Sequence, residues 1–193
     1  MMLLGMLVLP IQAALIYRTS PITNHQTNKY IHATLHSISL LVILFGVIAV
    51  YKSHIDQNIP NFYSLHSWCG ITTILLFISN YCIGLISFLY PGIQQHLRVW
   101  LVPYHALSGI LIIGSGTITI LLGLQEKLSF QIIFNKIDTT GTESTLINTV
   151  GILVLFTLIT IMYSMMNVSG HDKLRGSDSD EHESLLSTRS SYA

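Results

Sequence analysis

Charged residues are scarce in this sequence. Only 9% of its 193 residues are Asp, Glu, Lys or Arg, whereas soluble domains average about 25%. A protein with so little charge cannot expose most of its surface to water. Nine basic residues balance nine acidic residues, so nothing indicates nucleic-acid binding or attachment to a membrane surface through a basic segment.

Cysteine is also scarce. The chain contains two, Cys69 and Cys82, and both lie within apolar sequence. Two isolated cysteines form neither a disulfide framework nor a zinc cluster, so we interpret them as small buried apolar residues.

Long stretches without charge dominate the chain. Five of them contain no Asp, Glu, Lys or Arg: 1–17, 30–51, 67–95, 103–124 and 147–170. A membrane-spanning helix needs about 20 apolar residues, and all but the first stretch reach that length. We interpret the first as a shortened spanning helix; a signal peptide is less favoured, because no Lys or Arg precedes the apolar run. The pattern predicts an all-α, multi-pass transmembrane helix bundle of about five helices.

The charged residues lie mainly in the expected connections and in the C-terminal tail. Residues 1–170 are predicted to form the membrane domain, and the charged, Ser-rich tail 171–193 is predicted to be disordered in the cytosol. The expected connections are 18–29, 52–63, 90–102 and 125–146. Six Lys or Arg residues lie on the side of the tail and three on the opposite side, so the tail side is predicted to be cytosolic.

Four histidines lie close to the starts of the expected helices. His32 and His36 are four residues apart, which places both on one helix face. Because successive helices alternate in direction, His32 and His105 are expected near the cytosolic face and His66 near the opposite face. Imidazoles on facing helices are a common way to hold haem iron within a bundle.

Other interpretations of these histidines stay open on spacing alone. A single histidine at a helix end is more often an interfacial or hydrogen-bonded residue than a ligand. Proton relay and metal transport are further alternatives. The apolar stretches contain no Asp or Glu, and this absence favours ligands for a neutral cofactor over a transport pathway.

Several sequence motifs are specific enough to indicate a family. Tyr63-Ser-Leu-His66-Ser-Trp68 resembles the most distinctive motif of the cytochrome b561 family. The segments 97–109, 122–128, 29–32 and 14–18 also resemble it, in order and at the family's spacing. The resemblance covers residues 1 to 168 and is greatest to the duodenal and lysosomal branch.

The resemblance implies a transmembrane oxidoreductase. Members of this family have six transmembrane helices and two b haems, each held by two histidines. They transfer electrons from cytosolic ascorbate to ferric iron or monodehydroascorbate on the other side. By this resemblance, His32 and His105 are the axial ligands of the cytosolic-side haem, and His66 is one ligand of the far-side haem.

The resemblance also implies roles for residues outside the axial positions. Arg18, Lys29 and Arg98 are expected to attract the ascorbate anion, as cations around a vestibule do. His54 corresponds to a far-side histidine near the acceptor, although a solvated loop histidine is almost as well supported. His36 is expected to contact the haem site, either through a propionate or as a packed core residue.

The chain departs from the family at its start. The family's first helix and the beginning of its second are missing, which places the histidine partner of His66 upstream of Met1. We therefore expect the far-side haem to lack a ligand, so that one haem binds here instead of two. The alternative functions are a redox-incompetent fragment that serves as a partner or regulatory subunit, and a histidine-lined metal or proton transporter.

The tail suggests a location. Glu181-His-Glu-Ser-Leu185-Leu186 fits an acidic dileucine sorting motif, which makes an endosomal or lysosomal membrane the first choice and the plasma membrane the second. The sequon at Asn167 is expected to be unused, because the predicted topology places it on the cytosolic side. The expected partners are the lipid bilayer, ascorbate, the electron acceptor and, as a further option, a second copy of the chain.

Overall fold

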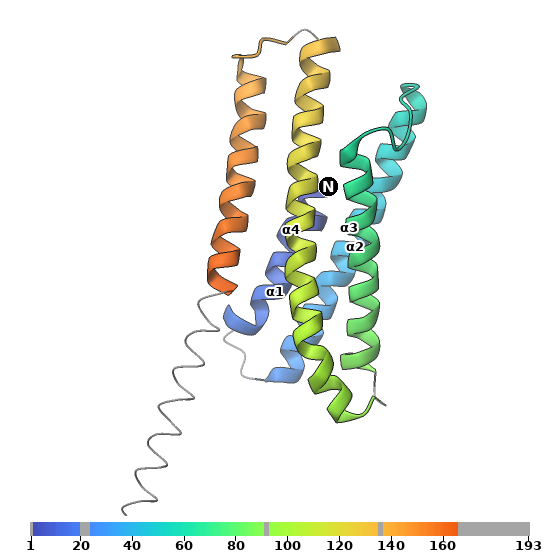
Figure 1. Cartoon of the computed structure of the whole chain (residues 1–193), viewed down its shortest axis with the longest axis vertical. Coiled ribbons are helices and arrows are strands. Elements are labelled where there is room, and N and C mark those ends of the chain that lie inside the picture. The colour runs from blue at the N-terminus through green and yellow to red at the C-terminus, as the bar shows by residue number, and fades with distance from the viewer. Residues whose placement is uncertain (1, 20–23, 91–92, 135–136, 166–193) are drawn as a thin grey trace, which may run out of the picture. The chain divides into compact units, whose positions relative to one another are not determined.

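The described part of the chain is helical apart from short turns. The computed structural model describes residues 2–19, 24–90, 93–134 and 137–165, and none of these residues forms a strand (Figure 1). The chain divides into two compact units, Met1–Val154 and Leu155–Ala193. All the site residues discussed below belong to the first unit. The predicted tail 171–193 and Asn167 lie outside the described residues.

The helical elements follow one another with short connections. In chain order they are the π-helical turn η1 (Leu4–Val8), α1 (Leu9–Thr19), α2 (His25–Asp56), α3 (Leu65–Gly84), the π-helical turn η2 (Leu85–Leu89), α4 (Gln95–Phe134) and a last helix, Thr142–Met165. Single π-helical turns of this kind are rare and occur often at functional sites.

Four helices are long and apolar enough to cross a membrane. These are α2, the α3–η2 segment Leu65–Leu89, α4 and Thr142–Met165, whereas the apolar helix Leu4–Tyr17 is shorter. Large apolar side chains are exposed along them, including Phe45, Ile48 and Leu111, as expected where lipid replaces water. The prediction of an all-α multi-pass membrane protein is confirmed.

The helices extend further than the charge-free stretches predicted. Residues 95–102 and 125–134 were expected in connections, but both belong to α4. The prediction failed because Arg98 and Glu126 lie near the ends of a long helix, where charged side chains can reach the polar boundary of the membrane. Pro103 lies inside α4, where it removes a backbone hydrogen bond; the first turns of α4 lean away from the rest of the helix (Figure 1).

Side-chain caps fix where α2 and α3 begin. The side chain of Asn24 accepts a hydrogen bond from the Gln26 backbone N–H at 2.9 Å, and the Ser64 hydroxyl accepts one from the Ser67 backbone N–H at 3.3 Å. Such caps satisfy amide groups that have no partner within the helix. The Ser64 cap places His66 in the first turn of α3.

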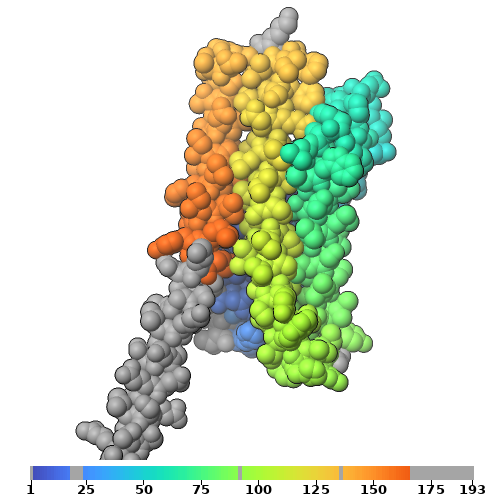
Figure 2. Space-filling view, in the orientation of Figure 1, coloured from blue at the N-terminus to red at the C-terminus, as the bar shows by residue number. Residues whose placement is uncertain are grey.

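The helices of the first unit pack in two pairs. η1 and α1 pack against α2, and α3 packs against α4; Figure 2 shows the surfaces of α3 and α4 meeting along the pair. Polar side chains link α3 to α4, with Thr73 donating to Ser115 at 3.2 Å and Ser108 donating to Asn80 at 2.7 Å. In membrane proteins such bonds contribute about 0.6 kcal/mol each on average.

Candidate functional site

Three histidine rings lie near one another, two from α2 and one from α4. The ring centroids of His32 and His105 are 6.3 Å apart, and those of His32 and His36 are 4.6 Å apart. Two imidazoles that ligate one metal ion from opposite sides, each about 2 Å from it, have centroids about 6 Å apart. The separation of the His32 and His105 rings therefore matches that of two such imidazoles.

The backbone of α1 orients the ring of His32. The Nδ1 atom lies 2.7 Å from the carbonyl oxygen of Ala13, and in the tautomer that donates this bond the Nε2 atom is left as an acceptor. Ligating histidines almost always donate their other ring N–H to a carbonyl or carboxylate. Tyr17 packs on the same ring with a centroid distance of 5.4 Å. The backbone of Ala13 and the ring of Tyr17 thus hold the ring of His32 in place.

His105 is held by contacts from α3 and η2. Its backbone carbonyl accepts hydrogen bonds from Ser108 at 3.0 Å and from the side-chain amide of Asn80 at 3.5 Å. The ring of Phe88 lies 5.3 Å from its ring. Its Nδ1 atom is buried with no hydrogen-bond partner among the described residues, so this nitrogen can form a hydrogen bond with a further group.

His36 lies one helical turn further along α2. It lies edge-on to His32, and its ring centroid is 5.5 Å from that of Phe77 on α3. Its Nδ1 atom is also buried without a hydrogen-bond partner in the described part of the chain. The structure shows no ring contact between His36 and His105, so His36 lines the site but is not paired across it.

Two of the three predicted ascorbate-binding cations converge beside this cluster. Lys29 donates to the carbonyl oxygen of Phe88 at 3.5 Å, and Arg98 donates to that of Tyr90 at 3.3 Å. The Nε atom of Arg98 is buried without a partner among the described residues. These two cations thus lie around the end of η2, near His105. The side chain of the third, Arg18, lies outside the described part of the chain.

His66 lies at the opposite end of the α3–α4 pair. Its Nδ1 atom is 2.9 Å from the carbonyl oxygen of Thr119 on α4, so here too a backbone carbonyl orients the ring. His66 lines a cavity of about 380 Å³ together with apolar side chains such as Leu122 and Phe130. Among the described residues, no ring contact pairs His66 with a second histidine.

A carboxylate links the start of α3 to α4 at this end. Glu126 accepts hydrogen bonds from the hydroxyl of Tyr63 and, at 3.1 Å, from that of Ser64. Partial burial and the Glu126 carboxylate raise the pKa of Tyr63 to about 12, so its phenol keeps its proton and donates throughout the physiological range. Because Ser64 is the N-cap of α3, Glu126 ties the turn that carries His66 to α4.

His54, the predicted acceptor-side histidine, lies in the last turn of α2. Its Nδ1 atom is 3.2 Å from the side-chain oxygen of Asn61 in the connection to α3. The short connection places His54 at the same end of the helices as the start of α3. Both the acceptor role and the solvated-loop interpretation are compatible with this position.

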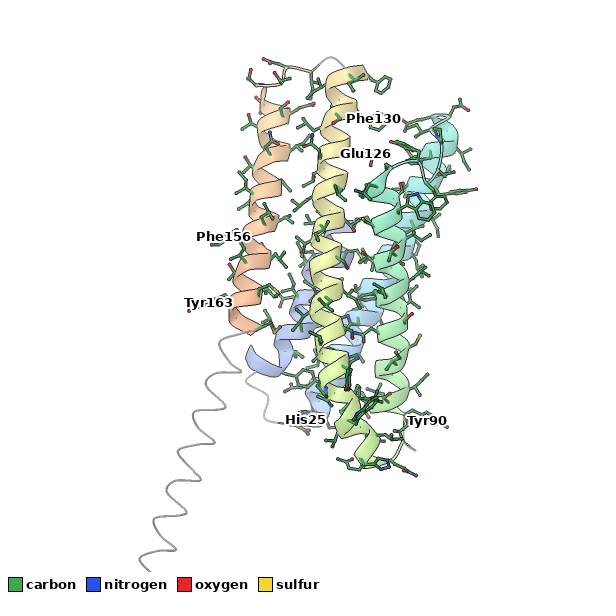
Figure 3. The ribbon with its side chains drawn as sticks, in the orientation of Figure 1. His25, Tyr90, Glu126, Phe130, Phe156 and Tyr163 are labelled. Carbon is green, nitrogen blue, oxygen red and sulfur yellow. The ribbon has the colours of Figure 1, made fainter. Side chains whose placement is uncertain are left out.

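The two clusters lie at opposite ends of the helices. Figure 3 labels His25 and Tyr90 at one end, near the His32–His105 cluster, and Glu126 and Phe130 at the other end, near His66. The clusters are separated because successive helices run in opposite directions, so the starts of α2 and α3 lie at opposite ends. His32, His36 and His105 thus lie toward one end of the helices, and His66 and His54 lie toward the other.

Sequence reasoning missed the residues that surround the histidines. Tyr17, Phe88 and Glu126 contact the predicted site residues or the turn that carries them. Tyr17 and Glu126 lie in segments that resemble the family, but no role at the site was predicted for any of the three. One signal was available, since Glu126 is acidic and follows the apolar stretch 103–124 closely. Among the described residues, no group of three or more His, Cys, Asp or Glu side chains is arranged to hold a metal ion.

Comparisons with known proteins identify a family. A family described as eukaryotic cytochrome b561 matches residues 1–131. The chain is 38% identical over 154 residues to a probable ascorbate-specific transmembrane electron transporter of rice (Oryza sativa subsp. japonica), which covers 80% of this chain and 65% of the relative. The chain thus spans less than two thirds of that relative.

Relatives from other organisms carry related names. A transmembrane ascorbate ferrireductase of Arabidopsis thaliana is 34% identical over 175 residues, covering 90% of this chain and 76% of the relative. A transmembrane ascorbate-dependent reductase of Sus scrofa is 35% identical over 162 residues, covering 84% and 64% respectively. The similarity thus extends across both plant and animal proteins.

Proposed function

This chain belongs to the eukaryotic cytochrome b561 family, and on that basis we propose that it transfers single electrons across a membrane from ascorbate through haem b. The donor side is cytosolic, and the acceptor on the other side is ferric iron or monodehydroascorbate. Ascorbate loses one electron and one proton and becomes monodehydroascorbate. Ferric iron gains the electron and becomes ferrous iron, whereas monodehydroascorbate as acceptor also takes up a proton.

The observation that supports this proposal most strongly is the pair His32 and His105. Their ring centroids are 6.3 Å apart, a separation at which both imidazoles would be able to hold one iron atom, and the Ala13 carbonyl leaves Nε2 of His32 as an acceptor. Haem b bound here would supply a one-electron carrier within the hydrocarbon region. His32 and His105 would hold its iron, and the unpartnered Nδ1 of His36 would hydrogen-bond a propionate.

The donor site would use the cations beside this cluster. Among the described residues, the hydrogen-bond partners of Lys29 and Arg98 are backbone carbonyls, and an ascorbate anion would replace these weak partners with a charge-assisted bond. The buried Nε of Arg98 offers a further donor. Arg18 is the third proposed ascorbate-binding cation and is included because of the sequence resemblance.

The acceptor side would be the end that carries His66 and His54. His66 has a fixed tautomer and an adjoining cavity, both of which suit a haem ligand. Its second ligand is not among the described residues, so we propose one haem for this chain by itself. His54 would lie nearer the acceptor.

The experiment that tests this function is haem quantification with a reduced-minus-oxidised spectrum, using ascorbate as reductant. The purified chain should show a Soret band and be reduced by ascorbate, with one haem per chain by pyridine haemochrome. Two haems would mean that a further ligand completes the His66 site. A chain without any Soret band would contradict the proposed function and favour a partner subunit or a transporter.

We place the protein in endosomal or lysosomal membranes because of the motif at 181–186, with the plasma membrane as second choice. Replacing Leu185 and Leu186 with alanine should move a tagged chain to the plasma membrane, because sorting adaptors read the two leucines. Confocal co-localisation with a lysosomal marker would measure this shift. Replacing Leu111, an exposed apolar residue in a spanning helix, provides the control.

A further inference from the structure

Two glycines lie directly against the rings of His66 and His105. A Cβ atom added to Gly84 on α3 would be 2.8 Å from Cε1 of His105 on α4, and one added to Gly123 on α4 would be 2.7 Å from Cε1 of His66 on α3. Real Cβ atoms essentially never approach so closely. Each ring can therefore occupy its position only because the facing residue has no side chain.

The two contacts are reciprocal. α3 contributes a histidine near its start and a glycine at its end, and α4 contributes the same two residues in the same order. Eighteen residues separate His66 from Gly84, and eighteen separate His105 from Gly123. Because α3 and α4 run in opposite directions side by side (Figure 1), each histidine meets the glycine of the other helix.

The residue one turn before each glycine also contacts the facing histidine. Asn80 precedes Gly84 by four residues and donates to the backbone carbonyl of His105 at 3.5 Å. Thr119 precedes Gly123 by four residues, and its carbonyl lies 2.9 Å from Nδ1 of His66. At both ends a polar contact and a glycine thus act on the same histidine, so the repeated pattern has a repeated structural role.

The glycine faces the carbon between the two ring nitrogens. In both cases the nearest ring atom is Cε1, and the distances from the added Cβ to Nδ1 and Nε2 are longer: 3.5 and 3.5 Å for His105, and 3.0 and 3.3 Å for His66. The glycine therefore limits where the ring can lie through a contact to carbon. Eighteen residues of helix rise about 27 Å, close to the thickness of the hydrocarbon core, about 30 Å.

From these contacts we propose that Gly84 is a positioning residue for haem ligation by His105. Gly84 sets the ring position of His105, and Gly123 sets that of His66 at the other end of the helix pair. The α3–α4 pair thus contains two copies of one ring-positioning arrangement, of which the copy at His105 acts on the proposed haem. This inference rests on the proposed function, because the rings must bind haem for their position to matter.

The test compares three glycine-to-alanine variants of the full chain. Gly84→Ala forces the ring of His105 to turn and should weaken haem retention about 10- to 100-fold, the range found when groups that orient a metal ligand are removed. It should also shift the low-spin EPR signal of that haem. Gly123→Ala should leave this haem unchanged and affect only a haem held at His66. Gly114→Ala is the matched control, because nothing lies within 4 Å of a Cβ added there.

A purely structural role for Gly84 would give a different result. Because alanine is the better helix former and a ring can turn away, the haem-free Gly84→Ala chain should unfold at the same temperature as the haem-free Gly114→Ala chain. A parallel loss of thermal stability and of haem would overturn the inference, as would haem retention equal to that of the control.

The outcome also separates this inference from the proposed function. A wild-type chain that never shows a Soret band overturns the proposed function and this inference together. A wild-type chain with haem and an unaffected Gly84→Ala variant overturns the inference alone. Loss of haem from Gly123→Ala as large as that from Gly84→Ala would also overturn the inference, because of these two glycines only Gly84 lies against the ring of His105.

Discussion

Replacement of His105 by alanine is expected to remove the haem from the cytosolic-side site. The ring centroids of His105 and His32 are 6.3 Å apart, which matches the separation expected of two imidazoles bound to one iron atom. Loss of groups that merely orient a metal ligand costs about 10- to 100-fold in affinity, so loss of the ligand itself should cost at least as much. Pyridine haemochrome quantification of the purified variant measures the effect.

His96 provides the matched control for this experiment. It is a histidine on the same helix, one residue into α4, but its side chain is exposed. His96→Ala should therefore keep the wild-type haem content. If His32 and His105 hold the same haem, His32→Ala should lose that haem as well. The double variant should then lose no more haem than either single variant. Retention of haem by His105→Ala at the wild-type level would refute the assignment.

Replacement of Lys29 and Arg98 by glutamine together is expected to slow reduction by ascorbate about 10- to 100-fold at low ionic strength, within the range of electrostatic steering. The two cations converge at the end of η2 beside His105, where they would attract an anionic donor. Salt screens such attraction, so the rate of the variant should depend less on ionic strength. Stopped-flow measurement of haem reduction at several salt concentrations gives both quantities.

A reductant without charge separates donor binding from damage to the haem site. The double variant should be reduced by an uncharged hydroquinone at the wild-type rate. Lys127→Gln, which changes an exposed lysine near the other end of α4, should behave as wild type with both reductants. An equal loss of rate with ascorbate and with hydroquinone would show that Lys29 and Arg98 support the fold and do not attract the donor.

The absence of charge predicted most of the helices. Charged residues are excluded from lipid because their burial is costly, and this exclusion is visible in the sequence without any knowledge of tertiary contacts. The prediction failed at the ends of α4, where Arg98 and Glu126 continue the helix. The boundary between helix and connection depends on local hydrogen bonding, such as the Ser64 cap of α3. Charge alone does not report these bonds.

The approach of His32 to His105 could be expected from helix direction alone, since alternation places both at one membrane face. Their role as ligands stays a prediction. The contacts that orient them could not be predicted, because they depend on how each helix is rotated about its own axis. The Ala13 carbonyl beside His32 and the bond between Tyr63 and Glu126 join residues far apart in the chain, and no local pattern identifies them.

The spacing between each histidine and the glycine on its own helix has a consequence for insertions and deletions. An α-helix has 3.6 residues per turn, so eighteen residues complete about five full turns and return to the same angle. α3 is regular over this interval, since the π-helical turn η2 begins only after Gly84. One added residue would rotate Gly84 by about 100° relative to His66. An insertion or deletion within 66–84 or 105–123 would therefore turn the glycine of that helix away from the facing histidine, whereas a substitution keeps the angle between histidine and glycine.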